Sequence, residues 1–175
     1  IAQAEHDAYS QSILISNNLD LIKKVNINLK KQLKQLPKAK IASSSLKNYG
    51  ISIFAKNKNK IINIINEIAP EHLELHVKNY KNFLKGIKNA GSIFLGKYSP
   101  EAMGDYLAGP NHVLPTSGSA KFSSGLSVND FLKRHSLIKI TKRGIERLGS
   151  SVINLAKHEN LEGHANSVRI RLNKD

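Results

Sequence analysis

The stretch S-I-L-I-S-N-N-L-D-L-I (residues 12–22) joins a short apolar run to a helical pattern. Its first five residues place three aliphatic side chains between serines, which is typical of a buried strand. Asn18 predicts a helix N-cap, because an asparagine side chain accepts hydrogen bonds from the first free backbone N–H groups of a helix. Apolar side chains then recur at helical spacing until Pro37 ends the pattern, at Leu19, Ile22, Val25, Leu29, Leu33 and Leu36. The stretch therefore predicts a strand followed directly by a helix.

The same alternation continues along the chain. A second helix is predicted over Lys40–Lys47, and Ile51–Ala55 and Ala90–Gly96 are predicted strands. Between these strands an isoleucine stripe predicts a further helix, which ends at Ala69–Pro70 because the residue before proline resists helical angles. Strands that alternate with helices predict an α/β fold, Rossmann-like, with a largely parallel sheet flanked by helices. Such sheets bind ligands beyond the carboxyl ends of their strands.

The rest of the chain loses this alternation. Residues 97–129 are rich in Gly, Ser and Pro and show little periodicity, and long irregular segments of this kind are often functional. Ser136–Thr141 resembles a strand, and Arg143–Leu172 has a helical pattern typical of a tail that packs against something else. We therefore expect an α/β part over residues 1–135 and a small tail region with helical character over residues 136–175.

The composition limits the classes of function. The chain has no Cys, so any metal site must use His, Asp, Glu or neutral oxygen donors. Its net charge of +14 leaves a basic nucleic-acid-binding module as an alternative. However, the lysines are scattered and no recognition motif accompanies them, so a solvated lysine surface is the favoured interpretation, with no nucleic-acid partner.

The ends and the apolar runs of the chain indicate no membrane role. No apolar run approaches the length of a membrane-spanning helix, so we expect no membrane partner. Residues 1–6 lack a basic region followed by an apolar stretch, so we expect no secretory signal. Since the sequence begins at Ile1 and not at Met, we expect either a processed chain or a fragment.

Two short motifs place polar groups at close spacing. Gln3 and His6 are three residues apart and would share one face of a helix, although such a pair on a surface helix is the ordinary alternative. Glu71 and His72 follow the rigid Pro70, and a carboxylate beside an imidazole suits acid–base chemistry. An exposed loop with ordinary charges is the alternative interpretation of this second motif.

Two further segments carry candidate residues. The first is G-D-Y-L-A-G-P-N-H-V-L-P-T-S-G-S-A (residues 104–120), where Asp105 and His112 lie among glycines and prolines that hold unusual backbone angles. The second is H-E-N-L-E-G-H (residues 158–164). Its Glu159 and His164 are five apart and fit one helix face imperfectly, so solvated side chains are the alternative there.

These four segments together resemble the histidinol dehydrogenase family. Residues 104–120, continued through K-F-S-S-G-L-S-V, resemble that family's longest signature. The Q-A-E-H opening, the A-P-E-H-L-E-L block (residues 69–75) and the terminal L-E-G-H-A-N-S-V-R stretch also match, in the family's order. The resemblance covers the whole chain and implies an NAD-dependent dehydrogenase that completes histidine biosynthesis.

The resemblance implies a role for each candidate residue. It implies one zinc ion per site, bound by a Gln, two His and an Asp, namely Gln3, His6, Asp105 and His164. It implies that His72 removes the proton of the L-histidinol alcohol and that Glu71 activates water for oxidation of the aldehyde. The substrate-binding set it implies comprises Gln3, His6, His72, Asp105, Glu159 and His164, with His112 as a further residue lining the pocket.

The resemblance also implies what lies outside this chain. Family members are more than twice as long, and the part that binds NAD precedes Ile1, so no cofactor-binding residue is expected among these 175 residues. Residues 1–135 would be the C-terminal part of the catalytic domain, and the tail would cross to the partner subunit of a cytoplasmic homodimer with shared active sites. We expect the 175 residues alone to be inactive. A truncated product that retains zinc ligands without hydride transfer is the alternative.

Overall fold

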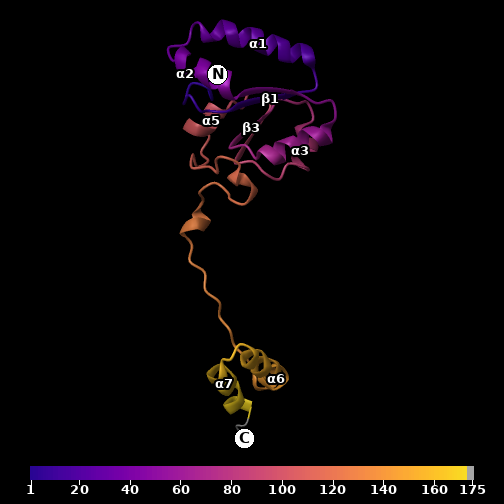
Figure 1. The fold of residues 1–175 in the computed structure, drawn as a ribbon, viewed down its shortest axis with the longest axis vertical. Coiled ribbons are helices and arrows are strands. Elements are labelled where there is room, and N and C mark those ends of the chain that lie inside the picture. Colours follow the sequence, from indigo (N-terminus) through magenta and orange to yellow (C-terminus); the bar gives the residue numbers. More distant parts are fainter. Residues whose placement is uncertain (173–175) are drawn as a thin grey trace. The chain divides into compact units, whose positions relative to one another are not determined.

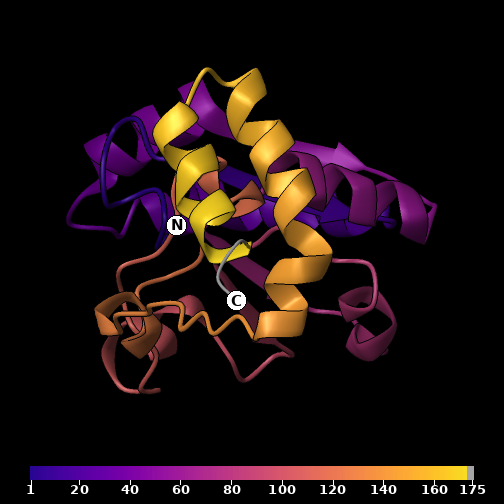
Figure 2. The ribbon, with the colours of Figure 1, turned by 90° about the horizontal axis from the view of Figure 1, so that it is seen from below.

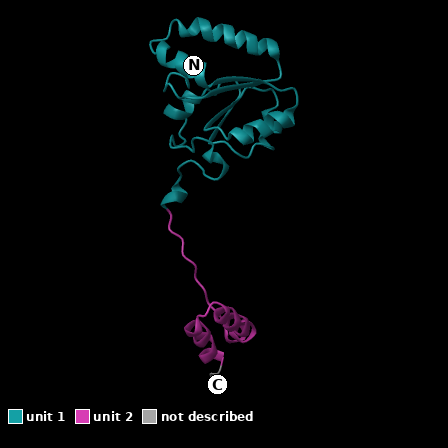
Figure 3. Ribbon diagram, in the orientation of Figure 1, with its two compact units in different colours: residues 1–131 teal, residues 132–175 magenta. Residues whose placement is uncertain are grey.

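A computed structural model describes residues 1–172 of the chain (Figure 1). The chain divides into two units, Ile1–Phe131 and Leu132–Asp175, which Figure 3 draws in different colours. The last three residues of the predicted tail region lie outside the described residues. The first unit holds all strands of the described part of the chain, and the second is built from two helices.

The first strand and helix form as the sequence predicts. Strand β1 (Ser12–Ser16) leads into helix α1 (Leu19–Leu33), and the Asn18 side chain accepts hydrogen bonds from the backbone N–H groups of Asp20 and Leu21 at 2.9 and 3.1 Å. Helix α2 (Ala39–Tyr49) then returns the chain to strand β2 (Gly50–Phe54), which pairs with β1 in parallel. The predicted strand–helix–strand unit is therefore confirmed.

A second pair of parallel strands follows in the chain. Helix α3 (Lys58–Ile68) ends at Ala69 and is followed by strand β3 (His72–Leu75), the short helix α4 (Tyr80–Leu84) and strand β4 (Ser92–Leu95). β3 pairs with β4 in parallel, with His72 opposite Ser92. Strand β3 is not among the predicted strands, because only two apolar side chains alternate in it. The α/β prediction holds, with two two-stranded parallel sheets among the described residues.

The irregular segment after β4 contains three short helical pieces. They are α5 (Glu101–Tyr106) and two 3-10 turns, η1 (Ser119–Lys121) and η2 (Val128–Phe131). Gly109 and Gly118 have φ angles of 97° and 81°, which residues with a side chain rarely adopt. These two glycines are therefore required by the backbone path of the segment.

The second unit is a helical hairpin. Helix α6 (Lys142–His158) and helix α7 (Glu162–Leu172) lie side by side, as Figure 2 shows in orange and yellow. Gly149 allows this contact, because a Cβ at that position would lie 2.8 Å from a methyl carbon of Leu172. The helical pattern from residue 143 onward is confirmed, with a break where Asn160 adopts a φ of 59°.

The predicted strand at Ser136–Thr141 is wrong. The segment has no strand geometry and no ladder partner, and Leu137 and Ile138 are 91% and 83% exposed. A β-branched, apolar run becomes a strand only when a neighbouring strand satisfies its backbone groups. Thr141 instead caps α6, its hydroxyl oxygen accepting from the N–H of Gly144 at 3.1 Å.

None of the described helices is both long and apolar enough to cross a membrane.

Candidate active site

Strand β3 and helix α5 bring together a cluster of four titratable side chains. His72 Nε2 lies 3.6 Å from Asp105 Oδ1 and 3.9 Å from Glu101 Oε1. On the other side, His112 Nδ1 lies 3.0 Å from the same Asp105 oxygen. The A-P-E-H-L-E-L and G-D-Y-L-A-G-P-N-H segments, about 30 residues apart in sequence, therefore meet at one point.

The backbone before β3 directs His72 toward this point. Helix α3 ends at Ala69, whose φ of 49° turns the chain into Pro70. The Gly91 N–H then donates to the Pro70 carbonyl at 2.9 Å, and the Ser92 N–H donates to the Glu71 carbonyl at 2.8 Å. A Cβ at position 91 would lie only 2.5 Å from the Glu71 carbonyl oxygen, so this approach requires glycine.

Helix α5 presents both carboxylates from one face. Glu101 and Asp105 are four residues apart, which places them one helical turn from each other. Gly104 lets the helix lie against strand β4, since a Cβ there would be 2.5 Å from the ring of Phe94. At its beginning, the Glu101 N–H donates to Glu74 Oε1 at 2.8 Å.

Three of the four side chains in the cluster are largely shielded from solvent. The side chains of His72, Glu101 and Asp105 are 15%, 14% and 11% exposed, whereas His112 is two-thirds exposed at the rim. His72 Nε2 is buried and has no hydrogen-bond partner among the described residues. A buried polar atom without a partner is costly, so this nitrogen is suited to accept a group that the chain itself does not supply.

The two carboxyl groups share a proton. A side-chain hydrogen bond to Asp105, together with burial and the negative charges of Asp105 and Glu74, raises the pKa of Glu101 from 4.5 to about 7. The same hydrogen bond lowers the pKa of Asp105; burial opposes this, and His112 lowers it further. Up to about neutral pH the pair therefore holds its proton on Glu101, and Asp105 carries the negative charge.

The donor atoms of the cluster suit a divalent cation. One donor atom each from His72, Glu101 and Asp105 lies within 4.8 Å of the others. An imidazole nitrogen with carboxylate oxygens is a ligand set that zinc accepts. Of these three residues, Asp105 carries the negative charge that suits a zinc ligand, so the cluster offers one anionic ligand to a zinc ion.

Gln3 and His6 lie in an N-terminal turn and not on a helix. The Glu5 N–H donates to the Ile1 carbonyl at 3.0 Å, and the His6 N–H donates to the Gln3 carbonyl at 3.4 Å. Ala4 between them is fully buried, which leaves Gln3 half-buried and His6 exposed. Grouping these side chains with Asp105 as zinc ligands stays a prediction.

Glu71 is half-buried immediately before β3, and its backbone carbonyl accepts a hydrogen bond from the Ser92 N–H. Its role as the base of the second oxidation stays a prediction.

Glu159 and His164 belong to the second unit. Glu159 ends helix α6, with its N–H donating to the Leu155 carbonyl at 3.2 Å. His164 lies in the first turn of α7, where its N–H donates to the Leu161 carbonyl at 3.0 Å. Both residues are exposed in the hairpin, and their roles in metal and substrate binding stay predictions.

Glu101 is a member of the cluster that the sequence did not reveal. The available signal was its spacing from Asp105, because two acids four apart repel each other on an isolated helix. In a chain with 13 acidic against 27 basic residues, such a pair suggests a compensating partner in the fold. That partner is the His72 imidazole, contributed by strand β3.

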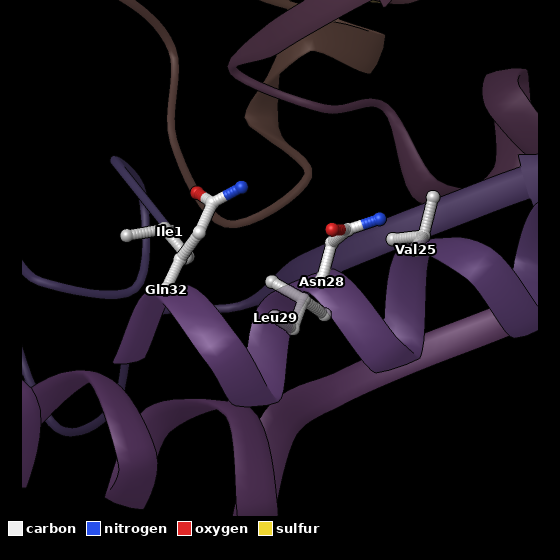
Figure 4. A pocket seen from close by; sticks show the side chains of 5 residues that line it. All are labelled: Ile1, Val25, Asn28, Leu29 and Gln32. Carbon is white, nitrogen blue, oxygen red and sulfur yellow. The ribbon is translucent and has the colours of Figure 1, made fainter. Parts of the chain in front are cut away.

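A shallow cavity lies away from this cluster. It has a volume of about 290 Å³ and is lined by one face of α1 together with the first residue, as Figure 4 shows: Ile1, Val25, Asn28, Leu29 and Gln32. None of these side chains titrates near neutral pH and none is a predicted site residue. The cavity therefore offers no alternative to the β3–α5 cluster as a reaction centre.

Comparison with known proteins agrees with the resemblance in the sequence. The family model described as histidinol dehydrogenase matches residues 1–172. Histidinol dehydrogenase of Pelagibacter ubique is 58% identical over 174 residues, covering 99% of this chain and 41% of the relative. That of Caldanaerobacter subterraneus is 48% identical over 175 residues, again covering 41% of the relative.

A solved structure is similar over nearly the whole chain. The crystal structure of histidinol dehydrogenase from Elizabethkingia anophelis has a TM-score of 0.88 and 40% sequence identity, covering 98% of this chain and 39% of that one. The chain thus spans about two fifths of the length of the relatives it matches. By its family match and its identity to these relatives, the chain belongs to the histidinol dehydrogenase family.

Proposed function

We propose that the full-length protein oxidises L-histidinol through L-histidinal to L-histidine, the last step of histidine biosynthesis, with zinc and two NAD. The observation that carries this proposal is the buried, unpartnered His72 Nε2 held 3.6 Å from an ionised Asp105. An acceptor for a proton and an anionic metal ligand at one point are what alcohol oxidation at a zinc centre needs.

His72 would act in the first oxidation. Its free nitrogen accepts the hydroxyl proton of the alcohol while a hydride leaves the carbinol carbon for NAD. The ionised Asp105 then stabilises the positive charge on the imidazole, because its carboxylate lies 3.6 Å away in a shielded site. An imidazole suits this step, since it takes and releases protons near neutral pH.

Glu71 would act in the second oxidation. Its neighbour His72 is held by the β3–β4 ladder, and the Ser92 N–H donates to the Glu71 carbonyl, so the backbone positions of the two residues are held together. A carboxylate beside the reaction centre can orient a water and take its proton as the water adds to the aldehyde. The hydrated aldehyde then loses a hydride to a second NAD and becomes the carboxylate.

Zinc would be bound by Gln3, His6 and Asp105 together with His164. When bound, the metal supplies Lewis acidity and a fixed point for the amine and imidazole of the substrate. Glu159 would bind the cationic amino group through its carboxylate, and His112 at the rim would line the pocket. NAD would bind to the part of the full-length protein that precedes this chain in the family.

The second unit supports a dimer with shared sites. Leu148, Val152 and Leu155 form a stripe along α6, each at least 44% exposed in the hairpin. An exposed apolar stripe on a surface helix is typical of an interface. We propose that a two-fold partner covers it and that each His164 and Glu159 completes the partner's site in the cytoplasmic enzyme.

The experiment is a stopped assay on the purified full-length protein with zinc, NAD and L-histidinol. The unmodified enzyme should form two NADH for each histidine. His72→Gln should slow the first oxidation by about a hundredfold or more, the usual size of a lost general base. Glu71→Gln should mainly slow the oxidation of added L-histidinal, with zinc retained in both variants. Unchanged histidinal oxidation by Glu71→Gln would remove Glu71 from the mechanism.

A further inference from the structure

A second residue of strand β3, Glu74, contacts the cluster: its side chain bonds to the backbone of Glu101. Glu74 lies two residues after His72, so both side chains emerge on the same face of the strand. Glu74 Oε1 accepts a hydrogen bond from the Glu101 N–H at 2.8 Å, across 27 residues of sequence. Its other oxygen, Oε2, lies 2.8 Å from His76 Nε2. One carboxylate therefore joins β3 to the first residue of α5.

Helix α5 needs such a support from outside. It has six residues, too few for a helix that is stable by itself. The residue at its N-cap position is Pro100, and no side-chain cap hydrogen bond forms there. The Glu74 carboxylate occupies the place of the missing cap, since it accepts from a free N–H and puts negative charge at the helix beginning.

The same helix carries both acids of the cluster. Asp105 lies one turn after Glu101, and its carboxylate faces His72 from a helix whose Gly104 lies close to the Phe94 ring. If the first turn of α5 shifted, Asp105 would move relative to His72. The distance between the proton acceptor and the metal ligand thus depends on the Glu74–Glu101 hydrogen bond.

We propose that Glu74 is a positioning residue, which anchors α5 to β3 and so sets Asp105 opposite His72 for zinc binding and alcohol oxidation. This inference rests on the proposed function, because it assigns Glu74 to that same site. Glu74 itself touches neither the metal nor the substrate. Its effect passes through the backbone of Glu101.

The test uses three variants of the full-length zinc enzyme. Glu74→Leu removes the acceptor at similar volume. Glu74→Gln keeps a carbonyl oxygen for the Glu101 N–H. His76→Asn is the matched control, because it removes only the exposed partner of the other carboxylate oxygen. The measurements are kcat and KM for L-histidinol, zinc affinity by chelator competition, and amide exchange of a peptide covering residues 98–108.

Glu74→Leu should lower kcat about tenfold and weaken zinc by a similar factor, as expected for losing a charged hydrogen bond that positions a ligand. KM should change less than kcat, and exchange in residues 98–108 should speed up. Glu74→Gln should stay within about threefold of the unmodified enzyme, because its amide oxygen still accepts. His76→Asn should behave as the unmodified enzyme in all three measurements.

Two outcomes would overturn the inference. One is a Glu74→Leu enzyme with unmodified kcat, zinc affinity and amide exchange. The other is a Glu74→Gln or His76→Asn enzyme as impaired as Glu74→Leu, since the helix anchor would then not be the cause. A failure of the proposed function is a separate result: the unmodified enzyme would not oxidise L-histidinol, while amide exchange would still report whether Glu74 anchors α5.

Discussion

His72 and Asp105 show how single side chains acquire a role through their surroundings. An imidazole in a loop with ordinary charges would be solvated, but here its Nε2 is buried without a partner and faces two carboxyl groups. Those two groups share a proton, so only one negative charge stands beside the imidazole up to about neutral pH. Holding the proton on Glu101 therefore keeps a second negative charge out of this shielded site.

The shared proton predicts a pH dependence of stability. The pKa of Glu101 is raised to about 7 in the folded chain, so its contribution to folding is present below its ordinary pKa of 4.5 and lost as the pH rises through about 7. Glu101→Gln stays neutral and should abolish this loss. In zinc-free enzyme, the variant should gain on the order of 1–2 kcal/mol relative to the unmodified protein between pH 5 and pH 8.

Unfolding by urea at several pH values measures this difference. Glu67→Gln on helix α3 is a suitable control, because that exposed carboxylate has no partner in the cluster. The effect of Asp105 on folding stability has the opposite pH dependence. Because its pKa is lowered in the folded chain, its stabilising contribution is present above pH 3.8 and is lost only in stronger acid. Parallel pH curves for Glu101→Gln and the unmodified enzyme from pH 5 to 8 would contradict the shared proton.

Helix α3 is tied to the loop before strand β4 mainly through the Asn66 side chain. The Asn66 amide nitrogen donates to the Gly86 carbonyl at 2.9 Å, and its oxygen accepts from the N–H groups of Lys88 and Asn89 at 2.7 and 3.2 Å. These three bonds shape the loop that leads into β4. Because β4 is the only ladder partner of β3 among the described residues, the loop also supports the strand that carries His72.

Asn66→Ala should therefore destabilise the protein. It leaves two N–H groups and one carbonyl without their partner, and because two of these three bonds are part-buried the loss costs about 2–3 kcal/mol. Asn63→Ala, one turn earlier on the same helix and exposed, should change the free energy of unfolding by less than about 0.5 kcal/mol. The urea midpoints of the two variants measure the contrast, and equal midpoints would show that the Asn66 bonds add nothing to stability.

The division of the chain into two units separates the predicted zinc ligands. The predicted zinc ligands are divided between them, with Gln3, His6 and Asp105 in the first unit and His164 in the second. The exposed stripe of α6 supports a partner subunit that receives the hairpin. In the proposed dimer each active site would use residues of both subunits, and one chain alone would not complete a site.

Mixing two inactive variants tests this arrangement. Full-length His164→Ala and His6→Ala homodimers should each be inactive, because every site lacks one ligand. A mixed dimer pairs the intact first unit of one subunit with the intact tail of the other and so regains one site. After exchange of subunits at equal concentrations, half of the dimers are mixed, and about one quarter of the unmodified activity should return. Mixed dimers without activity would mean that His164 serves its own chain.

The sequence by itself determined the local elements of the fold. Periodicity, the Asn18 cap and Pro37 placed β1, α1, α2, β2, α3, β4 and the helical character of residues 143–172, because their signals are local. The motifs also supplied His72, Asp105 and His112 as candidates. Each of these inferences rests on residues that are neighbours along the chain or along one helix face.

Only the tertiary structure decided which distant residues meet. Strand β3 forms because β4 satisfies its backbone, and the run at 136–141 stays irregular because no strand of the described residues pairs with it. Glu101 joins the cluster, and Glu74 anchors α5, through contacts across 27 or more residues of sequence. Pairing, burial and shared protons depend on separations in space, and spacing along the chain carries no record of them.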